Sequence, residues 1–398
     1  MYIVRTRARE PRRPRAHYIV HMPPARFPPV YLDANATEPL RPDARVAIAE
    51  ALDVTGNPSS VHGAGRAARR IMEDAREALA ARFGVRPADL VFTSGGTEAD
   101  ALAIHALGGG RRVIIGATEH EAVRAAAPGA TILPVDRNGT ADLDVLASLL
   151  GERPPALVCL MLANNETGVI QPVADAARIC DRYGSWLHVD AVQAAGRIAT
   201  DLKMLGAASM AISSHKLGGP AGAGALMLAS EVSSIAPLIA GGGQERGRRG
   251  GTQPVAVIAG FAAAAETSGD AGTLAPLRDR AERAAVACGA VVCGGEVPRL
   301  ANTTSLALPG VRAETQVIAL DLAGVAVSAG AACSSGKVAR SHVLHAMGLG
   351  PLAGEAIRVS LPWNTTAADV DAFAAAYSRM ALRLARETPD ADRRTLVD

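Results

Sequence analysis

The sequence predicts an α/β fold in which helices cover both faces of a mainly parallel sheet. Short apolar segments of strand length recur between residues 90 and 228, and helical periods separate several of them. Strands that are apolar along their whole length are typical of parallel sheets buried on both faces. Their alternation with helices indicates the α/β class.

Each predicted element follows from its own period of apolar residues. Apolar residues at helical spacing predict helices at 66–83, 97–106, 142–150, 172–183 and 254–267. Short, continuously apolar runs predict strands at 90–93, 112–116, 131–135, 156–162, 186–190, 210–213 and 225–228. No internal repeat of fixed period interrupts this order, so the sequence does not indicate a repeat protein.

A second, smaller α+β domain is expected after a break rich in Gly and Asp at 268–273. Beyond it the pattern is less regular, with strands near 290–293, 305–307 and 357–361. We therefore expect a large domain over residues 31–270 and a small domain over residues 271–398. The first part of the large domain, residues 31–45, is expected to be able to pack against the small one.

Residues 1–30 are expected to lie outside both domains. They contain seven Arg, six Pro and one Glu, and they have no apolar stretch long enough for the core of a signal peptide. Three interpretations stay open: a disordered arm with weak affinity for polyanions, an atypical targeting segment, or a start codon set upstream of the true one near Met22.

Composition and charge exclude several classes of protein. No run reaches 18 apolar residues, so no transmembrane helix is expected. The formal charge of the chain is +2. Residues 1–30 carry a net charge of +6, which leaves about −4 on residues 31–398. The main part of the chain is therefore not the basic surface of a nucleic-acid-binding protein. Five cysteines, an odd number, fit free thiols in a reducing compartment, and we expect a cytoplasmic protein.

Polar segments stand where three of the predicted strands end, which is where α/β sheets bind ligands. One is a Gly-Gly turn into a helix that could cradle an anion, although a simply capped helix start has the same pattern. Another ends in Asp190, and the third ends in Lys216, one of only three lysines in the chain. A phosphate cradle, a carboxylate and an amine at one sheet edge are what a pyridoxal phosphate site requires.

Seven short motifs then occur in one order along the chain. They are YLDANAT at 31–37, NPSSVH at 57–62, EH at 119–120, ANNETG at 163–168, SSHK at 213–216, RGGT at 249–252 and SAGAACSSG at 328–336. Between Tyr31 and about Pro362 the sequence thereby resembles the NifS/IscS-like cysteine desulfurases, class V aminotransferases of the fold-type I pyridoxal phosphate enzymes. The resemblance implies that fold and pyridoxal 5′-phosphate as cofactor.

The resemblance also implies roles for individual residues around the cofactor. Lys216 would form a Schiff base with it and move the Cα proton of the substrate, and Asp190 would pair with the pyridinium N–H. Gln193 would bond the phenolate oxygen, and His120 would stack on the ring and assist proton transfer.

Further roles by resemblance concern the phosphate, the substrate and the second subunit. The phosphate donors would be Gly96, Thr97, Ser213 and His215. Thr252 would come from the other subunit, which implies a homodimer. The substrate carboxylate would be bound by Asn165 and Arg358, the latter through the bidentate geometry that arginine offers.

Cys333 would be the catalytic cysteine by the same resemblance. Its thiolate would attack the sulfur of L-cysteine, releasing alanine and leaving a persulfide for a protein acceptor in iron–sulfur cluster assembly or in thio-cofactor or tRNA sulfuration. Its neighbours are Gly, Ala and Ser, as suits a mobile loop. No resident metal is expected, beyond transient contact of Cys333 with a cluster. The other cysteines are expected to be small buried apolar residues: Cys159, Cys180, Cys288 and Cys293.

The sequence departs from the family pattern in two places. Ala34 and Glu38 replace residues of the opening motif that are often polar or Thr, with little effect expected. The charged segment 387–398 lacks an aromatic residue, which puts docking to a housekeeping iron–sulfur scaffold in doubt.

Three alternative functions stay open. They are a selenocysteine lyase, another class V aminotransferase, and a non-catalytic sulfur-carrier adaptor.

Overall fold

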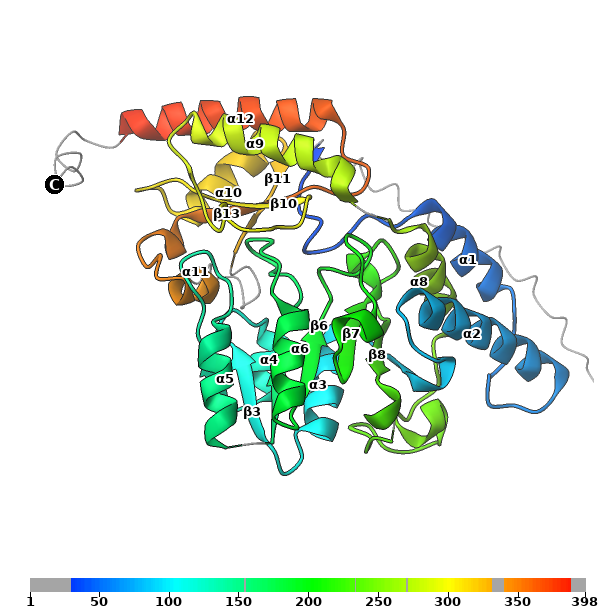
Figure 1. Cartoon of the computed structure of the whole chain (residues 1–398). Coiled ribbons are helices and arrows are strands. Elements are labelled where there is room, and N and C mark those ends of the chain that lie inside the picture. Colours follow the sequence, from blue (N-terminus) through cyan, green and yellow to red (C-terminus); the bar gives the residue numbers. More distant parts are fainter. Residues whose placement is uncertain (1–29, 154, 233, 270, 331–339, 388–398) are drawn as a thin grey trace, which may run out of the picture.

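Two larger sheets with helices packed on them, and a two-stranded sheet beside the smaller of these, make up the part of the chain that the structure describes (Figure 1). The computed structural model describes residues 30–153, 155–232, 234–269, 271–330 and 340–387. The expectations for residues 1–29, for Cys333 and for the charged tail beyond residue 387 therefore lie outside the described residues. Val30, which the sequence placed in the N-terminal extension, already belongs to strand β1 (Val30–Tyr31). None of the described helices is both long enough and apolar enough to cross a membrane.

The large sheet has seven strands in the order β2-β8-β7-β6-β5-β3-β4. They are β2 (Leu90–Thr93), β3 (Arg112–Gly116), β4 (Thr131–Leu133), β5 (Ala156–Cys159), β6 (Trp186–Asp190), β7 (Ser209–Ser213) and β8 (Gly224–Leu228). All pairings from β7 to β4 are parallel, whereas β8 runs antiparallel to both of its neighbours. The sheet is thus mainly but not wholly parallel. The connection from β7 to β8 spans only residues 214–223, too short for a parallel crossover.

Helices bury both faces of this sheet, as its apolar strands require. One face packs against α3 (Gly96–Leu107) and α4 (Glu121–Ala126), and the other against α5 (Leu143–Glu152) and α6 (Val173–Arg182). Neighbouring residues of one strand belong to different cores: Ile114 faces the second set of helices and Ile115 the first. A short helix, α7 (Leu202–Leu205), precedes β7.

A group of three helices flanks the large sheet at the end formed by β2 and β8 (Figure 1). It contains α1 (Pro42–Leu52), α2 (Gly63–Arg82) and α8 (Val255–Thr267), and α8 packs on both of the others. A side chain on Gly260 would meet Ile48 at 2.5 Å, so glycine allows α1 and α8 to approach closely.

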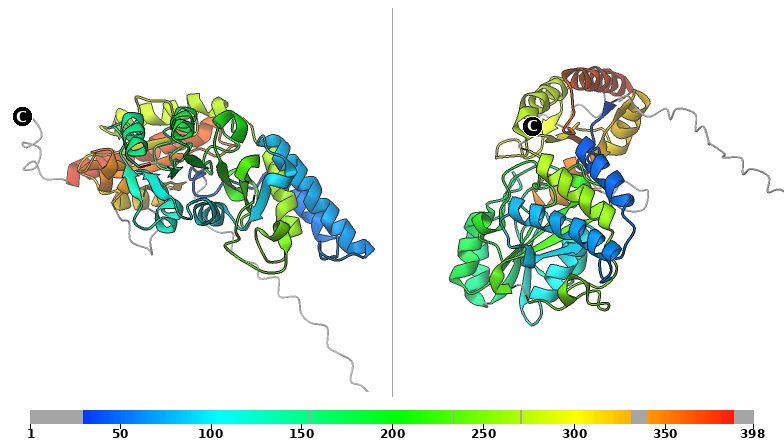
Figure 2. Two further views of the ribbon diagram at one scale, coloured as in Figure 1. Left: turned by 60° about the horizontal axis from the view of Figure 1, so that its bottom comes forward. Right: turned by 90° about the vertical axis from the view of Figure 1, so that its right-hand side faces the viewer.

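The last third of the chain forms an antiparallel sheet in the order β12-β13-β10-β9. Its strands are β9 (Val291–Val292), β10 (Thr303–Ala307), β12 (Ser328–Ala329) and β13 (Ala356–Ser360). The helices of this part are α9 (Ala275–Val286), α10 (Ala313–Leu322), α11 (His342–Ala346) and α12 (Ala367–Glu387). Figure 2 shows α9 and α12 side by side on the outside of the molecule.

The first described residues join this second core. Strand β1 pairs in parallel with β11 (Val325–Ala326), and Leu32 is fully buried in the same apolar cluster as Ile357. The following segment then crosses to α1 beside the large sheet. Residues 33–41 therefore connect the two cores directly. The domain boundaries derived from the sequence stay a prediction.

Candidate active site

A cavity of about 490 Å³ lies at the carboxyl ends of β6 and β7, between the two sheets. Ten of the residues singled out in the sequence line it: Gly96, Thr97, His120, Asn165, Asp190, Gln193, Ser213, His215, Lys216 and Arg358. A larger cavity of about 700 Å³ lies at the opposite end of the sheet, beside Trp186 and Lys203, and none of these ten lines it. Because ligands bind at the carboxyl ends of the strands in such sheets, we assign the active site to the smaller cavity.

Lys216 enters this cavity from a single 3-10 turn directly after β7. Its Nζ donates hydrogen bonds to the backbone oxygens of Asn35, at 2.6 Å, and Ala36, at 2.9 Å. Both acceptors belong to the segment that crosses between the cores. Of the other two lysines, Lys203 is exposed on α7 and Lys337 lies outside the described residues.

Asp190 closes β6 and is only 6% exposed. Its Oδ1 accepts a hydrogen bond from the backbone N–H of Val192 at 2.8 Å. Burial, together with the nearby carboxyl of Asp100, raises the pKa of Asp190 to about 7. A cationic N–H donor in the cavity would favour its charged form, so this carboxyl is suited to hold a pyridinium proton.

A buried polar chain lies beneath Asp190. The ring of His188 contacts the Ser209 hydroxyl at 2.8 Å and the Asp100 carboxyl at 3.1 Å. Burial lowers the pKa of His188 to about 4, so its ring is neutral at pH 7. Asp100 was not predicted from the sequence, because nothing in its local pattern separates it from an ordinary helix residue.

The first turn of α3, where the sequence predicts an anion cradle, packs closely on the neighbouring strands. A side chain on Gly96 would approach Val192 to 2.6 Å, and one on Gly224 would approach the backbone of Gly95 to 2.6 Å. Glycine at these points lets the turn lie directly against β8 and the end of β6. The N–H groups at this helix start favour an anion, with Ser213 and His215 along the same cavity wall. These donors fit the phosphate of pyridoxal phosphate.

His120 faces the same cavity from the start of α4. Its Nδ1 accepts a hydrogen bond from the backbone N–H of Ala122 at 3.1 Å, so the proton of the neutral ring resides on Nε2. Burial lowers the pKa of His120. The preceding Glu119 is fully buried and accepts from Met161 N–H at 2.7 Å, which fixes the backbone that carries the ring.

Arg358 reaches the cavity from β13 of the other sheet. It donates to Asp33 Oδ1 at 2.7 Å and to the backbone oxygen of Asn165 at 3.2 Å. Arg358 is 6% exposed, and these two contacts hold its guanidinium at the cavity wall. Asp33 was missed in the sequence, since it lies 325 residues from its partner.

Thr252 is the one described candidate that does not line the cavity; it is exposed. The loop before it is firmly held, because buried Glu245 accepts two hydrogen bonds from Arg76, each at 2.9 Å, and one from Gln253. Glu245 and its neighbour Arg246 have the only positive φ angles, 49° and 59°, among the described residues other than glycine. Thr252 therefore lies exposed at the end of a firmly held loop.

The described cysteines match their expected character with one exception. Cys159, Cys180 and Cys293 are buried, whereas Cys288 is only partly buried just after α9. The described residues contain no group of three or more His, Cys, Asp or Glu that could hold a metal ion.

Gly330 and Ser341, on either side of the segment 331–339, both lie against Glu166. The Ser341 hydroxyl donates to Glu166 Oε2 at 2.6 Å, and a side chain on Gly330 would lie only 2.1 Å from that same oxygen. Cys333 itself lies outside the described residues. Burial raises the pKa of Glu166.

Gly330→Ala should therefore lower the free energy of unfolding by about 1–3 kcal/mol, the cost of one disturbed buried hydrogen bond. The added methyl group would push Glu166 away from Ser341. Urea unfolding measures the change. Gly350→Ala is the control, because its side chain would meet nothing within 4 Å; equal stabilities of the two variants would contradict the expectation.

Comparison with known proteins agrees with this geometry. The Aminotransferase class-V family matches residues 30–373. A cysteine desulfurase of Cereibacter sphaeroides is 43% identical over 361 residues, which cover 86% of this chain and 93% of that protein. An IscS-like cysteine desulfurase of Mycobacterium tuberculosis is 38% identical over 368 residues, with 86% and 93% covered.

Among solved structures, a NifS-like protein from Rickettsia africae matches with a TM-score of 0.82 and 34% identity, over 88% of this chain and 99% of that one. The resemblance and the fold class inferred from the sequence are thus confirmed. The chain belongs to the class-V aminotransferase family and, within it, groups with the cysteine desulfurases.

Proposed function

We propose that this chain is a cysteine desulfurase, which converts L-cysteine into L-alanine and transfers the sulfur to Cys333. The observation that carries the proposal is the meeting of Lys216, Asp190, His120 and Arg358 in one cavity at the strand ends. Gly330, the last described residue before the segment that contains Cys333, lines that cavity as well.

Pyridoxal phosphate, when bound, supplies an electron sink for the carbanion that forms at the substrate Cα. The start of α3, with Ser213 and His215, would hold its phosphate. Asp190 would accept a hydrogen bond from the pyridinium N–H. Burial alone favours the neutral form of this carboxyl, whereas the hydrogen bond from the cationic ring would favour its charged form.

The remaining cavity residues bind the substrate and move protons. The guanidinium of Arg358 would hold the carboxylate of L-cysteine and so orient its Cα toward the Lys216 amine. Lys216 would take the Cα proton. The neutral ring of His120, with its proton on Nε2, can donate a proton at the substrate and recover one from it.

Cys333 would receive the sulfur. Its thiolate attacks the substrate sulfur, the Cβ–S bond breaks, and the electron pair of that bond returns with a proton to the carbon, giving alanine. L-cysteine and a thiol thus become alanine and a persulfide, so atoms and electrons balance. A reductant or a protein acceptor then removes the outer sulfur.

The proposal also concerns the partners of the protein and its compartment. The exposed Thr252 and its rigid loop support a homodimer in which each subunit completes the other's phosphate site. The sulfur acceptor would be an iron–sulfur scaffold or a thiolation enzyme, and the compartment would be the cytoplasm.

Cys333→Ala tests the function directly. The wild-type protein loaded with pyridoxal phosphate should give alanine and, with a reductant, sulfide in equal amounts, because each turnover releases one of each. The variant should retain the cofactor and yield no sulfide, since no thiolate remains to take the sulfur. If wild type binds the cofactor yet forms no alanine from cysteine, the desulfurase proposal is wrong, and selenocysteine and amino donors become the substrates to try.

A further inference from the structure

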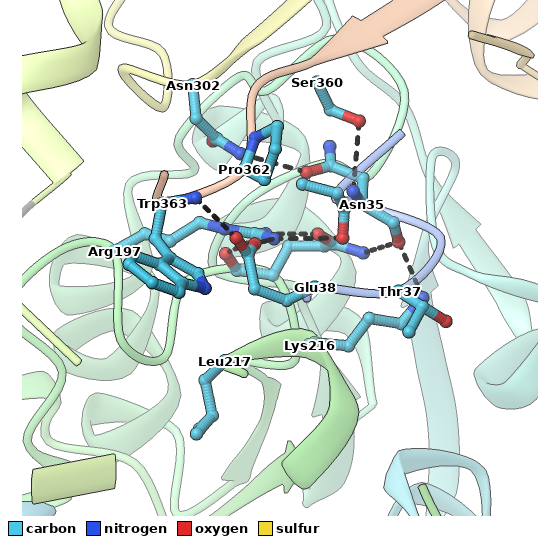
Figure 3. Close-up of polar contacts among 12 residues, drawn as sticks. Asn35, Thr37, Glu38, Arg197, Lys216, Leu217, Asn302, Ser360, Pro362 and Trp363 are labelled. Atoms are coloured by element: carbon cyan, nitrogen blue, oxygen red, sulfur yellow. Dashed lines mark hydrogen bonds and ion pairs between the residues drawn. The ribbon is translucent and has the colours of Figure 1, made fainter. Parts of the chain in front are cut away.

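The segment 33–38, which we call the strap, connects the small sheet to the cofactor lysine (Figure 3). On the small-sheet side, Asn35 N–H donates to the Ser360 hydroxyl at 3.0 Å, and Asn302 donates to the Asn35 side-chain oxygen at 3.3 Å. On the other side, the Asn35 backbone oxygen accepts from Lys216 at 2.6 Å and from Gln193 at 3.1 Å. One carbonyl group therefore holds two residues of the cofactor site.

The strap ends in a buried ion pair. Arg197 donates to Glu38 Oε2 at 3.0 Å, and both side chains are 5% exposed. The other oxygen of Glu38 accepts from the backbone N–H of Trp363 at 2.7 Å, a residue that follows β13. Glu38 thus joins the large domain, the strap and the small sheet at one carboxylate.

Arg197 extends the network to the cofactor site. It donates to the Gln193 side-chain oxygen at 2.5 Å, and Gln193 in turn donates to Asn35. The connection Glu38–Arg197–Gln193–Asn35–Lys216 is therefore continuous. A second cavity of about 160 Å³ is lined by Glu38, Arg197 and Lys216 together, so the ion pair lies directly behind the lysine.

A buried ion pair of this kind is sensitive to loss of either charge. Removal of one partner leaves the other charge buried without compensation, which costs far more than the pair contributes in net stability. In the sequence, Glu38 is a departure from the family motif from which little effect is expected. Its burial in this network leads us to the opposite expectation.

We propose that Glu38 and Arg197 are positioning residues that, through Asn35 and Gln193, set the place and the proton affinity of the Lys216 nitrogen. This inference rests on the proposed function, since it concerns the lysine that would carry the cofactor. Other charged and titratable groups line the two cavities together with Lys216 and remain unchanged in the test below. They are Asp33, Arg41, Asp100, His120, Asp190, His215 and Arg358.

Glu38→Gln is the direct test. The variant keeps the size of the side chain but leaves the Arg197 charge uncompensated near the Lys216 nitrogen, and a positive charge disfavours protonation. The pH at which the visible absorption band of the loaded protein titrates should fall by about one unit. We also expect kcat to fall severalfold, with KM for L-cysteine little changed.

Two further variants separate positioning from simple destabilisation. Glu38→Asp retains the charge and should return the titration midpoint toward that of wild type. Glu38→Gln with Arg197→Gln removes both charges and should do the same, even where thermal stability stays low. If the midpoint of the absorption titration follows the thermal stability of these variants rather than the charge at residues 38 and 197, the inference is wrong.

Glu282→Gln is the matched control. Glu282 and Arg299 form an ion pair of 2.6 Å with side chains 14% and 7% exposed, away from both cavities. Its loss should lower thermal stability and leave the absorption midpoint unchanged. An unshifted midpoint in loaded Glu38→Gln would overturn this inference alone, whereas failure of wild type to bind the cofactor would overturn the proposed function.

Discussion

Lys216→Ala should abolish alanine formation from L-cysteine, with a loss of at least about 10⁴-fold in rate. The described cavity offers no other lysine, so neither the covalent hold on the cofactor nor the base for the Cα proton can be replaced. Arginine stays protonated at any relevant pH and cannot take over. Alanine production in the presence of excess pyridoxal phosphate is the measurement.

The control for this variant is Lys203→Ala, which removes an exposed lysine on α7 at the far end of the sheet. It should retain wild-type activity and the visible absorption of the bound cofactor. Substantial alanine production by Lys216→Ala would show that another group performs the chemistry, and the roles assigned to this cavity would have to be redrawn.

The local sequence pattern was sufficient to place much of this cavity. Asp190 and Lys216 each follow an apolar run, and apolar runs become strands whose carboxyl ends share one edge. The direction of β8 was not predictable from its composition. It depends on the short connection that carries Lys216, which forces an antiparallel return.

The residues that hold the site in place could not be read from local patterns. Arg358 meets Asp33 across 325 residues, and Arg197 meets Glu38 across 159. Only the folded chain brings such residues together, because no period of the sequence relates them. Glu38 stood out in the sequence only as a departure from a family motif, and its partner Arg197 did not stand out at all.

Asp190→Asn should lower alanine formation by about 100-fold or more, while the cofactor still binds through its phosphate and Lys216. Asparagine can keep the hydrogen bond from Val192 N–H, so the fold around β6 persists. A neutral amide cannot hold the pyridinium proton, and the electron sink is weakened. Initial rates at saturating L-cysteine, with cofactor absorbance to confirm loading, measure the effect.

The same variant should change how the stability of the cofactor-free protein depends on pH. Burial raises the pKa of Asp190 from 3.8 to about 7, so between these values the folded chain binds a proton that the unfolded chain has lost. The contribution of Asp190 therefore makes the free energy of unfolding fall as pH rises from about 4 to about 7. Asparagine does not titrate, so in Asp190→Asn this fall should be shallower than in wild type. Urea unfolding at several pH values measures the free energy of unfolding of wild type and variant. The control is Asp181→Asn, because Asp181 is an exposed residue on α6. Parallel pH profiles for wild type and Asp190→Asn would mean that Asp190 is already ionised in the folded chain and needs no cationic partner to stay so.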